Sequence, residues 1–79
     1  MDIKVLGPGC PKCESVEKNA REAVDEMGVE ATISKVTKLA EIMEYDVVMT
    51  PALVINGKVK VSGRVPGKDE VKGWIKEED

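Results

Sequence analysis

The pair of cysteines at Cys10 and Cys13 constrains this chain more than any other feature. They are the only cysteines in the sequence, and they lie within Gly7-Pro8-Gly9-Cys10-Pro11-Lys12-Cys13-Glu14. A short apolar run precedes them and a long helical pattern follows, which predicts a strand, a tight turn and a helix. Cα atoms three residues apart on a helical turn lie about 5–6 Å from each other, near the separation that a disulfide prefers. The two sulfurs can therefore form or break a disulfide with little backbone movement.

The start of a helix also favours the ionised form of Cys10. Unpaired N–H groups and the positive end of the helix dipole stabilise a thiolate there, and thiols in such motifs have pKa values of roughly 3.5–7.5. Pro11 suits the first helical position, and Lys12 adds a little positive potential. We predict that Cys10 is the nucleophile and that Cys13, further into the helix and less exposed, resolves the mixed disulfide. C-x-x-C between a strand and a helix is a redox signature, and the alternative is two buried cysteines that act as small hydrophobic residues.

Size and composition exclude several classes of function. The 79 residues predict one domain, residues 1–79. No apolar run approaches the ~20 residues needed to span a bilayer and no signal-peptide pattern is present, so we expect a cytoplasmic protein. The formal net charge of −3 and the scarcity of aromatic residues argue against nucleic acid as a partner. Histidine is absent, which excludes His-assisted nucleophilic catalysis and mixed Cys/His zinc sites.

The spacing of apolar residues predicts alternating strands and helices. A long amphipathic helix ends at Gly28, and a last helix packs Trp74 against the sheet. The expected order is β-α-β-α-β-β-α, with strands over 2–6, 29–36, 52–55 and 58–62 and helices over 11–27, from Thr37 to Asp46, and over 68–77.

Local signals add detail to this order. We expect Thr37 to cap the second helix and its apolar residues to lie in the core, namely Leu39, Ile42 and Met43. Asn56-Gly57 predicts a type I′ turn between the last two strands. The last strand alternates lysine and valine. We expect its lysines to point outward at an edge of the sheet, where they discourage pairing with other chains.

Several short motifs, in this order along the chain, resemble those of a known superfamily. They are Gly7-x-Gly9-Cys10-x-x-Cys13, Glu17-Lys18-Asn19-Ala20, Thr50-Pro51-Ala52-Leu53-Val54, Asn56-Gly57 and Gly63-Arg64-Val65-Pro66. Together they resemble the thioredoxin/glutaredoxin fold and, more closely, the small redox-active disulfide proteins of archaea and bacteria. The resemblance covers nearly the whole chain. It implies an α/β thioredoxin fold in which a four-stranded mixed sheet is flanked by three helices.

The resemblance also implies a substrate-binding surface. The Thr50–Pro51 bond is then cis, Pro51 packs beside the two cysteines, and the Thr50 backbone pairs with an extended substrate segment. An ordinary trans proline in a turn is the alternative. Gly63 is implied to belong to the same surface. The implied partners are disulfide-containing proteins and an electron donor of the thioredoxin-reductase type.

The sequence departs from both main branches of the superfamily. Thioredoxin has Trp before C-G-P-C and a buried aspartate beneath the motif. Here Gly9 precedes Cys10 and the first strand has no acid beyond Asp2, so the proton acceptor of the resolving thiol is unassigned. Glutaredoxin has C-P-Y-C and a Gly-Gly-x-Asp-type segment that holds glutathione. This chain has C-P-K-C, and in place of the Gly-Gly-x-Asp-type segment it has only Gly63 and a later Asp69. Glutathione binding is therefore doubtful, although the C-P-x-C pattern by itself favours it.

These observations favour a thiol–disulfide oxidoreductase, a small thioredoxin-like electron carrier. We expect a monomer with no metal and no cofactor beyond the Cys10–Cys13 disulfide. The alternative is a soft-metal (copper or zinc) binding or metallochaperone module that uses the same cysteines. Metal-transport domains with C-x-x-C after their first strand run β-α-β-β-α-β and end in a strand, whereas the helix predicted here ends the chain. A third possibility is a redox fold used only for interaction, against which the intact cysteine pair counts.

Overall fold

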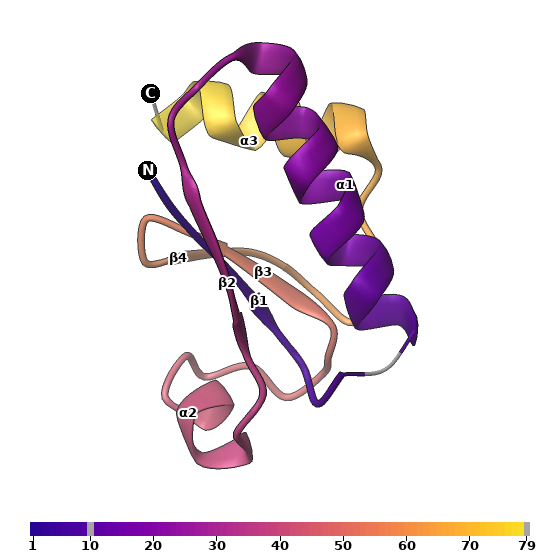
Figure 1. Cartoon of the computed structure of the whole chain (residues 1–79). Coiled ribbons are helices and arrows are strands. Elements are labelled where there is room, and N and C mark those ends of the chain that lie inside the picture. Colours follow the sequence, from indigo (N-terminus) through magenta and orange to yellow (C-terminus); the bar gives the residue numbers. More distant parts are fainter. Residues whose placement is uncertain (10, 79) are drawn as a thin grey trace.

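The computed structural model describes residues 1–9 and 11–78 and has the predicted order of elements (Figure 1). Cys10 and Asp79 lie outside the described residues. The strands are β1 (Asp2–Leu6), β2 (Thr32–Val36), β3 (Ala52–Ile55) and β4 (Lys58–Ser62), and the helices are α1 (Pro11–Met27), α2 (Leu39–Met43) and α3 (Lys68–Glu78).

Within the described residues the strands form one mixed sheet in the order β2-β1-β3-β4. β1 pairs in parallel with β2 and antiparallel with β3, and β3 pairs antiparallel with β4. The two central strands carry the apolar runs, and every residue of β3 is buried. The architecture is the four-stranded mixed sheet with three helices that the resemblance implies.

The helices cover the two faces of the sheet unequally. α1 and α3 pack on each other and on one face, and Figure 1 shows them side by side with α2 by itself. They enclose the larger core cluster, which consists of Ile3, Val5, Val16, Ala20, Ala23, Val24, Leu53, Ile55, Val71 and Ile75, with Trp74 packed against it. On the other face Ile42 of α2 meets Leu6, Ala52 and Val54. Full burial of a large aliphatic side chain is worth about 1.5–3 kcal/mol, so most of the stabilisation lies on the α1 and α3 side.

The second strand is shorter than predicted. It begins at Thr32 and not at residue 29, because its pairing with β1 starts at Asp2 opposite Thr32. Residues 29–31 have no strand pairing. Val29 and Ala31 are half-buried against the larger cluster instead, so their alternation reflects packing beyond the end of α1.

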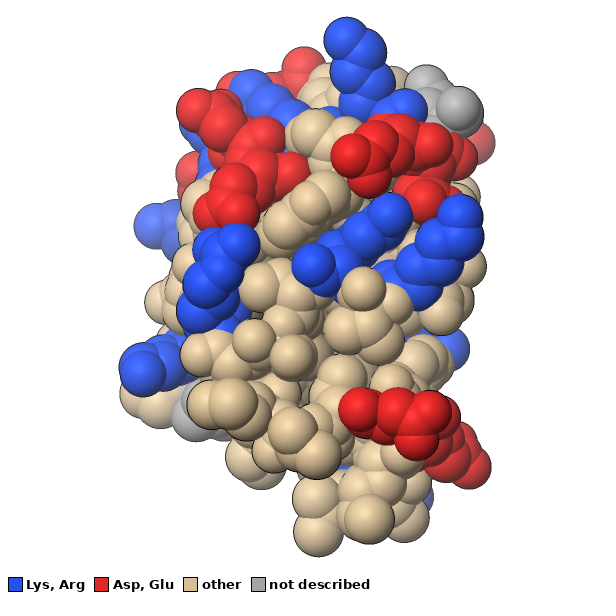
Figure 2. All heavy atoms as spheres, turned by 180° about the vertical axis from the view of Figure 1, so that it is seen from behind, with Lys and Arg blue, Asp and Glu red and all other residues tan. Residues whose placement is uncertain are grey.

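The prediction for α2 is wrong in its cap and in two of its three core residues. The residue before the helix is Lys38, in extended conformation and without a side-chain cap, so Thr37 does not cap it. Ile42 is buried, but Leu39 and Met43 are 72% and 62% exposed. A helix of five residues makes fewer than two turns and presents one side chain to the sheet. The lower part of the face in Figure 2 is mostly uncharged, apart from an acidic patch at its right edge.

The β3–β4 hairpin has the predicted turn. Asn56 and Gly57 both have positive φ, 51° and 82°, as a type I′ turn requires. β4 is an edge strand, as expected, but its lysines do not both point outward. Leu53 pairs with Val61 and Val54 with Val59, so Lys60 is the extra residue of a β-bulge.

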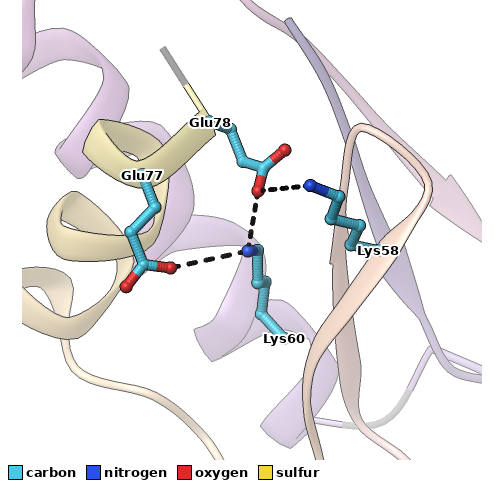
Figure 3. A network of polar contacts seen from close by, with 4 residues as sticks. All are labelled: Lys58, Lys60, Glu77 and Glu78. Carbon is cyan, nitrogen blue, oxygen red and sulfur yellow. Dashed lines mark hydrogen bonds and ion pairs between the residues drawn. The ribbon is translucent and has the colours of Figure 1, made fainter.

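The bulge directs Lys60 to the last turn of α3 (Figure 3). Its ammonium lies 2.9 Å from a Glu78 carboxylate oxygen and 3.6 Å from one of Glu77, and its side chain is 12% exposed. Lys58 binds the same Glu78 oxygen at 3.2 Å. The hydrogen bond with Glu78 raises the pKa of Lys60, and the same contact lowers the pKa of Glu78. These lysines therefore hold the end of α3 against the edge strand.

Candidate functional site

The site lies at the junction of β1 and α1. β1 ends at Leu6, and the Gly7 N–H continues its pairing by donating to the Val36 carbonyl oxygen at 2.9 Å. Gly9, with φ of 93°, takes a backbone conformation that glycine adopts without strain. α1 then begins at Pro11, as predicted. Cys10 lies outside the described residues, so its predicted role as nucleophile remains a prediction.

Cys13 lies in the first turn of α1 and faces the interior. It is 5% exposed, and it belongs to the buried face of the helix with Val16 and Ala20. Pro11 and Lys12 are exposed on the outer side of the same turn. Hence the helix presents the second cysteine of the motif to the core, while the residues between the cysteines face solvent.

The substrate-binding residues implied by the resemblance come together beside this turn. The Thr50–Pro51 bond is cis, which confirms the expectation, and Pro51 is buried while Thr50 is exposed. The Gly63 N–H donates to the Pro51 carbonyl oxygen at 2.9 Å. Thr50 and Cys13 both border Gly7, since a methyl group built on Gly7 would lie 3.8 Å from Thr50 Cβ and 3.3 Å from Cys13 Cβ.

Sequence reasoning missed three residues of this site. Gly7 stands in the predicted cysteine motif without a role of its own, although a glycine next to a reactive motif is a signal of close packing. Val48 and Met49 have no role in the sequence-based prediction, yet they are apolar and 96% and 59% exposed directly before Thr50. The Met49 side chain lies over Gly63, where its Cβ, Sδ and Cε would each be 3.3 Å from a Cβ at that glycine. An apolar pair directly before a Thr-Pro motif was the available signal.

No polar or charged side chain is buried among the residues that the structure describes. A buried acid beneath the second cysteine is therefore absent from this part of the chain, in agreement with the departure noted in β1. Several charged side chains form ion pairs, such as Arg21 with Glu17 and Arg64 with Glu70. Cys13 lies in the first turn of α1, where the positive end of the helix dipole favours a negative charge.

Comparison with known proteins agrees with this geometry. The sequence model of the thioredoxin domain family matches residues 1–76. The chain belongs to the thioredoxin domain family. Among curated proteins it is similar to a thioredoxin of Methanothermobacter thermautotrophicus, with 42% identity over 72 residues, which cover 91% of this chain and 94% of that protein. It is also similar to a thioredoxin of Methanocaldococcus jannaschii, with 38% identity over 74 residues, which cover 94% and 85% of the two chains.

The thioredoxin family accounts for both the fold and the activity. The chain has a thioredoxin fold and is a thiol–disulfide oxidoreductase, as its sequence predicts. Its order of elements, β1-α1-β2-α2-β3-β4-α3, is the one expected of a thioredoxin, whereas C-x-x-C metal-transport domains run β-α-β-β-α-β. Within the described part of the chain, no three His, Cys, Asp or Glu side chains form a group that could hold a metal ion.

One further feature of this thioredoxin-family chain concerns membranes. Among the helices of residues 1–9 and 11–78, none has the length and apolar character needed to cross a bilayer.

Proposed function

We propose that Cys10 and Cys13 are the redox-active pair of this oxidoreductase. The Cys10 thiolate attacks one sulfur of a substrate disulfide, forms a mixed disulfide and releases the other sulfur as a thiolate. The Cys13 thiolate then attacks Cys10 Sγ and displaces the second substrate sulfur. Two electrons pass to the substrate, and the Cys10–Cys13 disulfide remains for a reductase to reduce.

The position of Cys13 is the observation that carries this proposal. Its side chain is 5% exposed in the first turn of α1, three residues after Cys10 in the sequence. A substrate cannot readily reach a sulfur so enclosed, whereas a neighbouring mixed disulfide at Cys10 can be reached from inside. Exposed Pro11 and Lys12 support the motif by starting the helix and by adding positive charge at its surface.

The substrates we propose are disulfide-containing proteins that bind along Thr50, Pro51 and Gly63. Thr50 is exposed next to the buried Pro51, so its backbone is available to an extended segment that adds to the protein as a strand does. Val48 and Met49 supply exposed apolar contact area directly before it. A protein segment with apolar residues beside its cysteine fits this surface.

We also propose an electron donor, a cellular compartment and an oligomeric state. The electron donor is a reductase of the thioredoxin-reductase type. The chain lacks the Gly-Gly-x-Asp-type segment that holds glutathione in glutaredoxins, which makes glutathione a doubtful partner. The protein acts in the cytoplasm as a monomer, without metal or cofactor other than its own disulfide. It binds neither nucleic acid nor membranes.

The roles of the two cysteines are tested by trapping. Cys10→Ser should abolish reduction of a protein disulfide, because no nucleophile remains. Cys13→Ser should accumulate a mixed disulfide with the substrate, visible as a species on a non-reducing gel that disappears with reductant. A Cys13→Ser protein that never captures substrate during turnover would contradict the assignment. Stoichiometric copper or zinc bound by the reduced wild type would favour the metal-binding alternative.

The substrate surface is tested by comparing two methionines of similar exposure. Met49 contacts Gly63, while Met43 lies on α2; they are 59% and 62% exposed. Met49→Ser should raise KM for a protein disulfide by about three- to tenfold, since loss of an apolar interface contact costs roughly 1 kcal/mol. Met43→Ser should leave KM unchanged. Equal effects of the two substitutions would remove Met49 from the docking surface.

A further inference from the structure

Gly7 is held in place by its backbone and has close neighbours at the position where a side chain would begin. Its N–H donates to the Val36 carbonyl oxygen of β2 at 2.9 Å, and the residue is buried. The side chains of Cys13 and Thr50 both border that position. The missing side chain of Gly7 therefore leaves room that the second sulfur of the motif occupies.

Glycine is required at position 7 because there is no room for a side chain, and not because of the backbone conformation. Gly9, Gly28, Gly57 and Gly63 have positive φ, but Gly7 does not. A Cβ built on Gly7 would lie well under 3.0 Å from Cys13 Sγ, a separation that real Cβ atoms essentially never show. It would also lie 3.3 Å from Cys13 Cβ, a tight contact that needs a shift of only a few tenths of an ångström, so the sulfur is the main obstacle. Among the described glycines, no other has a neighbour so close.

We propose that Gly7 is a positioning residue for the resolving step. Because it lacks a side chain, the Cys13 sulfur can occupy the space against the end of β1, from which it attacks Cys10 Sγ. A single methyl group at Gly7 moves the Cys13 sulfur out of this place while leaving the nucleophile free to react. The inference rests on the resolving role proposed for Cys13.

An aromatic disulfide such as dithionitrobenzoate separates the two steps. The Cys10 thiolate breaks its S–S bond, forms Cys10–S–S–aryl and releases one coloured thiolate. The Cys13 thiolate, having lost its proton to water, then forms the Cys10–Cys13 disulfide and releases the second thiolate. Two electrons from the protein reduce one aromatic disulfide to two thiolates, and the two releases are counted by absorbance.

We expect Gly7→Ala to slow the second release by about 10- to 100-fold, as displacement of a reacting atom by about 1 Å can. The first release should stay close to the wild-type rate. The equilibrium of the Cys10–Cys13 disulfide with dithiothreitol should also shift toward the dithiol, because the closed pair is strained. Wild-type rates in both phases and an unchanged equilibrium would overturn the proposal.

Two variants make the experiment specific. Gly73→Ala is the matched control, because a Cβ at Gly73 has no neighbour within 4 Å, and both phases should match the wild type. Cys13→Ser should give one release only. Two releases from Cys13→Ser would refute the proposed function itself, whereas a single release together with an unaffected Gly7→Ala would refute only the role of Gly7.

The proposal stays testable when Gly7→Ala alone fails to fold. The double variant Gly7→Ala/Cys13→Ala lacks the sulfur that the new methyl group would meet. It should therefore fold, with a thermal midpoint close to that of Cys13→Ala. If the double variant also fails to fold, Gly7 serves the backbone of the β1–α1 junction and not the position of the sulfur, and the proposal is overturned.

Discussion

Leu53 and Leu39 are the same residue type in opposite surroundings. Leu53 lies in the central strand β3, is 0% exposed and packs against α1 and α3 in the larger core cluster. Leu39 lies in the first turn of α2 and is 72% exposed. Both stand in apolar patterns in the sequence, so their difference arises from the place of the element that carries each one: β3 is a central strand of the sheet, whereas α2 buries only Ile42.

We expect Leu53→Ala to lower the free energy of unfolding by about 2–5 kcal/mol, because it removes buried methyl groups and leaves a cavity. Leu39→Ala should change the free energy of unfolding by less than about 0.5 kcal/mol, as substitutions at exposed positions do. Urea denaturation of the two variants provides the measurement. Similar losses in both would mean that α2 is packed more tightly than its exposure indicates.

At the scale of elements, the start of α3 shows how one carboxylate can serve as a cap. Gly67 precedes the helix without a capping side chain, but its N–H donates to Glu70 Oε1 at 3.3 Å. Arg64 contacts both oxygens of Glu70, at 2.9 and 2.7 Å. These bonds lower the pKa of Glu70 from its ordinary 4.5 to about 2, with the Arg64 hydrogen bonds as the main cause and the Gly67 N–H second.

The lowered pKa of Glu70 makes this contribution dependent on pH. Because the folded-state pKa lies below the unfolded value, the stabilisation is fully present above pH 4.5 and is lost as the pH falls toward 2. We expect Glu70→Gln to have a lower Tm than the wild type at neutral pH. The difference should shrink steadily below pH 4.5. A Tm difference that stays constant from pH 7 to pH 2 would contradict the assignment.

Elements with strong local signals could be predicted from the sequence, and those set by their neighbours could not. Helix α1 and the Asn56-Gly57 turn follow from periodicity and turn chemistry, and both appear with the predicted bounds. The bulge at Lys60 leaves no mark in an alternating strand, because it depends on how β4 pairs with β3. The start of β2 likewise depends on where β1 begins to pair.

For the whole molecule, the order of elements and the sheet could be predicted because the motifs in the sequence are spread along the chain. The cis bond before Pro51 came from resemblance and not from physical reasoning on the residues. The contact between Gly7 and Cys13 could not be derived from the sequence, since the two residues meet only when β1 and α1 are folded against each other. Prediction therefore succeeds for the order of the elements and is weakest for the contacts between them.

The unequal covering of the sheet has a consequence for how the chain opens. One face is closed by two helices and ten buried residues, and the other by the five-residue α2 and a cluster of four. Segments with few buried contacts unfold locally at lower free energy than the core does. The backbone of α2 should therefore exchange its amide hydrogens with solvent long before β1 or β3. Thr50 and Pro51 lie between α2 and β3, so the segment that we propose binds substrate is anchored at its C-terminal end and moves more easily at its N-terminal end.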